Sequence, residues 1–112
     1  MVKEKESEMR FIVKATLPVD TGNEFVRSPN MAAVVDKVMG DLRPEAAYFA
    51  VEMGQRTIYF IVSVEKTSEI TRICEPLWLA LSADVELIPA MSQEDFGEAM
   101  ASIGEVVAAT SA

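Results

Sequence analysis

The sequence predicts an α+β fold of the ferredoxin-like type, with the order β-α-β-β-α-β followed by a C-terminal helix. Three observations support this fold. Several stretches alternate apolar and polar residues, as half-buried strands do. Others carry apolar residues at helical spacing. A glycine-containing turn joins two of the alternating stretches into a hairpin. Right-handed crossovers then place both main helices on one face of a four-stranded antiparallel sheet.

The chain begins with a charged, unpatterned segment, 1–8, which we expect to be a flexible tail. Residues 9–112 are expected to form a single ferredoxin-like domain. Its first strand covers 9–17, where alternation is regular up to Pro18. The next segment, 18–30, is rich in turn residues, and Gly22-Asn23 is typical of a turn. A short helical turn around residues 24–27 is an alternative for part of this segment.

A helix of roughly three turns is expected to follow Ser28 and Pro29, the residues typical of a helix start. Its apolar residues recur at helical spacing: Met31, Val34, Val35, Val38 and Leu42. Pro44 ends it.

The segment 46–64 is the predicted hairpin. A type II′ turn at Gly54-Gln55 would pair Val51 with Ile58 and Phe49 with Phe60. The side chains expected to face the helices are Phe11, Val13, Phe49, Val51, Ile58, Phe60, Val62 and Leu87.

A second helix is expected over 67–82, with a kink or break at Pro76 and with Cys74 as a buried thiol. The last strand covers 84–91, and Pro89 places it at a sheet edge because proline cannot donate to a ladder. A third helix begins with a capping box at 92–95. Gly97 and Gly104 lower the stability of this helix in isolation, so we expect it to dock on another surface.

The sheet face opposite the helices is apolar but interrupted by charges, and a monomer would rarely leave such a patch in water. We expect a second copy to cover it through a two-fold axis. The alternatives are the C-terminal helix of the same chain and a ligand. The interface candidates are Ile12, Lys14, Ala50, Glu52, Tyr59, Ile61, Glu86 and Ile88.

The composition excludes several functions. A formal net charge of −8 without a basic stripe disfavours nucleic acid and anionic membranes as partners. The chain has one cysteine and no apolar leader, which favours a cytoplasmic protein. It has no histidine, and therefore lacks the usual general base and the commonest metal ligand. We expect neither a metal nor a cofactor.

Several short stretches resemble a family of small bacterial proteins of about a hundred residues, for which no activity is established. The resemblance runs from about Met9 to the C-terminus and implies a dimeric α/β-barrel, ferredoxin-like fold. The stretches are Thr21-Gly22-Asn23, the segment 42–49, Gly54-Gln55-Arg56-Thr57, the segment 75–79, Pro89-Ala90-Met91 and Glu94-Asp95. This chain departs from the family pattern at Trp78 and Ala90.

Five residues are candidates for a ligand-binding cleft near the end of the sheet: Tyr48, Arg56, Thr57, Glu75 and Trp78. In this hypothesis Trp78 stacks on a ligand and Arg56 holds an anion. The structural alternative is that Arg56 pairs with a nearby carboxylate, Tyr48 fills the dimer interface and Trp78 packs beside the kink.

The leading functional hypothesis is a cytoplasmic homodimer that binds a small molecule between sheet and helices, without catalysis. One alternative is a cofactor-free oxygenase or isomerase of the dimeric α/β-barrel type, which would need Glu52 or Glu86 kept partly protonated by burial. The other is an interaction module that recruits a partner through Leu79 and the C-terminal helix.

Overall fold

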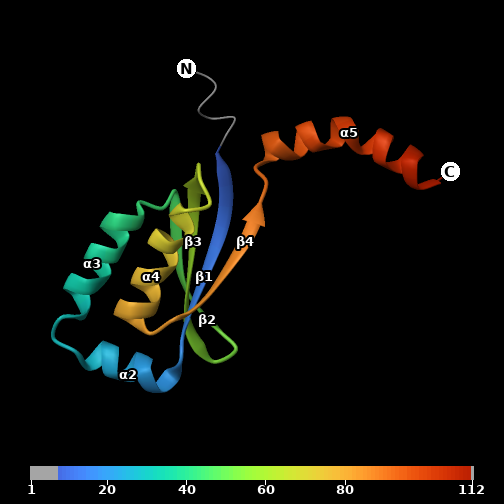
Figure 1. Cartoon of the computed structure of the whole chain (residues 1–112). Coiled ribbons are helices and arrows are strands. Elements are labelled where there is room, and N and C mark those ends of the chain that lie inside the picture. Colours follow the sequence, from blue (N-terminus) through green and yellow to red (C-terminus); the bar gives the residue numbers. More distant parts are fainter. Residues whose placement is uncertain (1–7, 112) are drawn as a thin grey trace.

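The computed structural model describes residues 8–111 and contains one four-stranded antiparallel sheet (Figure 1). Its strands lie in the order β2-β3-β1-β4. Their bounds are β1 Met9–Leu17, β2 Ala46–Glu52, β3 Gln55–Val64 and β4 Asp84–Ala90. The predicted tail falls almost wholly outside the described residues.

Four helices accompany the sheet: α2 Val19–Arg27, α3 Met31–Leu42, α4 Glu69–Leu81 and α5 Gln93–Ser111. Figure 1 shows α3 and α4 side by side over one face of the sheet, α2 at the lower end, and α5 projecting away from the sheet. The predicted ferredoxin-like α+β arrangement is confirmed, with α2 as an additional helix.

The core lies between this sheet face and the covering helices. Val13 and Ala15 of β1 and Phe60 of β3 are almost completely buried against Leu77 of α4. Alternate residues of β1 and β3 point into the core because side chains of a strand alternate between faces. The two central strands therefore carry most of the sheet's buried surface.

The hairpin register differs from the predicted one by two residues. The turn is Met53-Gly54, with φ angles of 55° and 76°, as a type I′ turn requires. Phe49 therefore pairs with Ile58, and Val51 pairs with Arg56. The shift is an even number of residues, so every side chain keeps its predicted face.

The connection predicted as turn-rich is in fact mostly helical. Helix α2 begins after Pro18, and the Gly22 amide donates a hydrogen bond to the Pro18 carbonyl at 2.7 Å. The Gly22-Asn23 pair lies inside this helix and is not a turn.

Two residues predicted to be core are exposed. Phe49 and Val51 of the edge strand β2 have 65% and 80% of their surface in contact with solvent. They share the face of core residues such as Ile58, but α2 and α3 do not close over this edge of the sheet. An open pocket results.

The other predictions for the second half of the chain are largely confirmed. Strand β4 is an edge strand and contains Pro89, as expected. Helix α4 continues through Pro76, so of the predicted kink or break the break does not occur. Cys74 is buried in its apolar stripe.

Helix α5 begins with the predicted capping box. The Asp95 amide donates to Ser92 Oγ at 3.0 Å, and the Ser92 amide donates to Asp95 Oδ2 at 3.3 Å. No residue of α5 is buried, so the helix does not dock on its own chain. Among residues 8–111, no helix has both the length and the apolar character required to cross a bilayer.

Candidate functional site

A pocket of 410 Å³ opens between the β2 edge of the sheet and the helices α2 and α3. Its volume falls within the range of small-molecule sites, about 300–1,000 Å³. The lining is mainly apolar and consists of Leu17, Phe25, Val26, Met31, Val35, Phe49, Ala50, Val51, Arg56, Thr57 and Ile58. The pocket can therefore bury an apolar body and offers few polar contacts.

The one charged side chain in this lining belongs to Arg56. Its Nη2 donates a hydrogen bond to Asn23 Oδ1 at 3.1 Å. A Cβ added to Gly22 would stand 2.8 Å from Nη1, so the guanidinium depends on the bare backbone of α2 at that position. Arg56 pairs with an amide, not with the carboxylate that the structural alternative expected.

Thr57 is the second polar residue of the lining and is 1% exposed. Its hydroxyl donates to the Gln55 carbonyl at 3.0 Å, so its polar atom already has a partner. Thr57 therefore fixes the start of β3 and adds little polarity to the pocket.

The other three ligand-binding candidates lie elsewhere. Tyr48 lies beside Tyr59 on the sheet face opposite the helices α3 and α4, here called the open sheet face. Glu75 and Trp78 are exposed on α4, and neither lines the pocket. The structure thus brings together Arg56 and Thr57 and separates them from the predicted stacking residue.

The open sheet face carries the interface candidates in adjacent positions. Ile12 of β1 pairs with Ile61 of β3 on one side and with Ile88 of β4 on the other. This row of isoleucines crosses three strands, and all three side chains are half-buried. The α5 helix leaves the row uncovered.

Charged groups on this face pair within the chain. Lys14 Nζ lies 3.0 Å from Glu52 Oε2, and the Tyr59 hydroxyl donates to Glu52 Oε1. The hydrogen bonds from Tyr59 and Lys14 hold the pKa of Glu52 below its ordinary value. The same contact with Glu52 raises the pKa of Tyr59.

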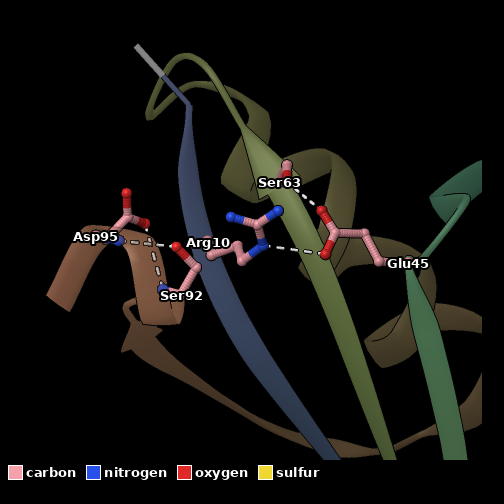
Figure 2. A network of polar contacts seen from close by, with 5 residues as sticks. All are labelled: Arg10, Glu45, Ser63, Ser92 and Asp95. Carbon is pink, nitrogen blue, oxygen red and sulfur yellow. Dashed lines mark hydrogen bonds and ion pairs between the residues drawn. The ribbon is translucent and has the colours of Figure 1, made fainter. Parts of the chain in front are cut away.

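A second polar network lies near the start of β1 (Figure 2). Arg10 Nε contacts Glu45 Oε1 at 3.0 Å, and Ser63 Oγ donates to Glu45 Oε2 at 2.8 Å. These hydrogen bonds, from Arg10 first and Ser63 second, lower the pKa of the Glu45 carboxyl. The capping box of Ser92 and Asp95 lies close by in the same view. This network fastens the start of β2 to the two central strands.

The enzyme hypothesis required a carboxylate kept partly protonated by burial. The pKa of Glu52 is lowered instead, by Tyr59 and Lys14. Glu86 is exposed on β4, and neither carboxylate lines the pocket. The described residues also contain no cluster of three or more residues with metal-binding side chains.

Cys74 is a buried thiol, as predicted. Burial, and secondarily the charge of Glu75, raises the pKa of the thiol, which keeps the nucleophilic thiolate scarce.

Sequence reasoning allowed a short helical turn around residues 24–27 and placed Met31 on a helix, but it did not predict that Phe25, Val26 and Met31 line a pocket. The available signal was the apolar pair Phe25-Val26, which stands between the charged residues Glu24 and Arg27. Such a pair is more typical of an amphipathic helix than of a solvated loop.

In comparisons with known proteins, no protein-family model matches this sequence, and no curated protein is significantly similar to it.

Proposed function

We propose that this protein is a cytoplasmic homodimer that binds a small, largely apolar molecule in the pocket between β2, α2 and α3. The single observation that supports binding most directly is the pocket itself, which holds 410 Å³ and is walled mainly by apolar side chains. Exposed apolar surface of this kind is a common mark of ligand-binding grooves.

The exposure of Phe49 and Val51 strengthens this proposal. Both residues point to the helix side of the sheet, yet most of their surface is in water. A bound apolar molecule would remove this surface from water and would be stabilised by the hydrophobic effect. Binding of an apolar ligand in the pocket is therefore favourable and requires no rearrangement of the core side chains.

The dimer part of the proposal is supported by the open sheet face. Ile12, Ile61 and Ile88 form an apolar row, and the nearby charges Lys14 and Glu52 already neutralise each other. Burying a charge that has a partner costs much less than burying a lone one. Of the interface candidates, only Ala50 also lines the pocket, so a dimer through this face leaves most of the pocket lining accessible.

The cytoplasmic part of the proposal is supported by the single cysteine, Cys74, which is a buried thiol. Unpaired thiols are typical of proteins that work in a reducing compartment.

A neutral fluorescent dye, N-phenylnaphthylamine, tests the pocket. We expect the wild type to bind it with increased fluorescence. Val51→Asp should weaken binding about tenfold or more, because it places a charge in the pocket wall. Leu79→Asp is the matched control, since Val51 and Leu79 are both 80% exposed and Leu79 lies on α4 outside the pocket. Equal binding by both variants and the wild type would reject the pocket as the site.

A second candidate function is an interaction module. Leu79 is exposed on α4, and the apolar residues of α5, including Phe96 and Ile103, are also about half exposed. These surfaces would suit a partner protein with an apolar groove. Affinity capture with wild type and Leu79→Asp tests it: a partner retained by the wild type should be lost from the variant, whereas dye binding should not change.

A further inference from the structure

Resting on the proposed function, we infer that the pocket ligand is an amphipathic carboxylate. Its head group would pair with the guanidinium of Arg56, and its apolar body would lie against Phe49 and Val51. Arg56 is the only charged residue in the lining, and it stands beside a wall of aliphatic and aromatic side chains. A site with one cation and a long apolar wall matches a molecule with one anion and a long apolar chain.

Most hydrogen-bond donors of the Arg56 guanidinium are available to a ligand. It carries five N–H groups in a planar fork, and among the described residues one hydrogen bond accounts for it, from Nη2 to Asn23 Oδ1. None of the ion pairs formed by the described residues involves Arg56. Such a fork matches a carboxylate in geometry as well as in charge.

Helix α2 fixes where this fork lies. Gly22 leaves room for Nη1, because a Cβ at that position would stand 2.8 Å from it, and Asn23 anchors Nη2. Holding the side chain in one place lowers the entropic cost of binding an anion. Arg56 is therefore positioned before the ligand arrives.

The charge of the whole protein makes the inference specific. With a formal net charge of −8, the protein repels anions on average. A preference for an anionic ligand over a neutral one of the same shape must therefore come from a local cation. In the pocket that cation is Arg56.

Titration calorimetry with decanoate and decan-1-ol, below the micellar concentration of decanoate, tests this inference. The two probes share a chain and differ in the head group. We expect the wild type to bind decanoate about tenfold or more tightly than decan-1-ol, as a charge-assisted contact allows. Arg56→Gln should abolish this preference, because the affinity for decanoate should fall far more than the affinity for decan-1-ol. Arg72→Gln changes the net charge equally from an exposed position on α4 outside the pocket, and should keep the preference.

The outcomes separate the two proposals. If neither probe binds, the proposed function and this inference both fail. If decan-1-ol binds as tightly as decanoate, or if Arg56→Gln keeps the preference, the pocket stands and the inference is overturned. An equal loss in Arg56→Gln and Arg72→Gln would also overturn it, because long-range charge would then explain the preference.

Discussion

The guanidinium of Arg56 lies directly over Gly22, and a Cβ at position 22 would stand 2.8 Å from its Nη1. Gly22 belongs to α2 and Arg56 to β3, so this contact ties the extra helix to the hairpin. Gly22 belongs to the stretch Thr21-Gly22-Asn23, and Arg56 belongs to the stretch Gly54-Gln55-Arg56-Thr57. The contact gives those two stretches a shared structural role.

Replacing Gly22 with alanine should move Arg56 without unfolding the protein. The atom in the way is the end of a flexible side chain, and the other neighbour, Leu17 Cβ, is at an ordinary 3.6 Å. Alanine also favours a helix over glycine by about 0.5–1 kcal/mol. We therefore expect thermal stability to stay equal or rise slightly, while the preference for decanoate over decan-1-ol falls, as measured by calorimetry.

Gly97→Ala provides the matched control, because it makes the same change in α5, where a Cβ meets nothing within 4 Å. It should leave ligand binding unchanged. A large loss of stability in Gly22→Ala would show that the backbone of α2, and not the arginine, is what requires glycine there.

The strands were readable from the sequence because their signals are local. Alternation defined β1 from Met9 to Leu17, and Pro89 marked β4 as an edge. The capping box formed by Ser92 and Asp95 likewise predicted the start of α5. Each signal depends on residues close together in the chain, so no knowledge of tertiary contacts was needed.

Features that depend on distant residues were not readable in the same way. Gly22 was interpreted as a turn residue, but its missing side chain leaves room for Arg56, which comes from another element. Phe49 has the pattern of a core residue, yet α2 and α3 leave it 65% exposed at the β2 edge. Trp78 has the right chemistry for stacking, but α4 places it away from the pocket. Of the two candidates Arg56 and Trp78, only Arg56 lines the pocket.

Acid should weaken the contact between Glu52, Lys14 and Tyr59. The folded state lowers the pKa of Glu52, so its contribution to stability is present above the pKa of the unfolded chain. That contribution is lost as pH falls through the lowered pKa. We expect Glu52→Gln to melt below the wild type near neutral pH, with the difference shrinking in acid, as followed by circular dichroism.

Glu105→Gln removes the same charge from the exposed helix α5 and serves as the control. Its melting temperature should track that of the wild type across the same pH range. A Glu52→Gln difference that is constant from neutral pH to strong acid would contradict the assigned ionic contact.

A charge in the isoleucine row should separate the proposed dimer. Ile61 lies between Ile12 of β1 and Ala46 of β2 on the open face. Ile61→Glu would place a carboxylate from each copy in the proposed interface, where burying the charge costs free energy. We expect the dissociation constant to rise more than tenfold in sedimentation equilibrium, with secondary structure unchanged by circular dichroism.

Leu79→Glu, on the helix side of the molecule, should leave the dimer intact. A wild-type mass that stays at 12.3 kDa at high concentration would refute dimerisation altogether.

Removing α5 should leave the rest of the fold intact. The helix has no buried residue and projects from the end of β4, and the core consists of residues from the other elements. A chain ending at Ser92 loses little buried apolar area, so its unfolding free energy should change by no more than about 0.5 kcal/mol. That corresponds to a shift of no more than about 4 °C in melting temperature. Ellipticity should fall by the helical share of α5 alone.

A much larger drop in melting temperature would show that the apolar stripe around Phe96 and Met100 packs on a folded surface in solution. Repeating the melt over a range of protein concentrations would then assign that surface, because stabilisation by a second copy depends on concentration, whereas stabilisation within one chain does not.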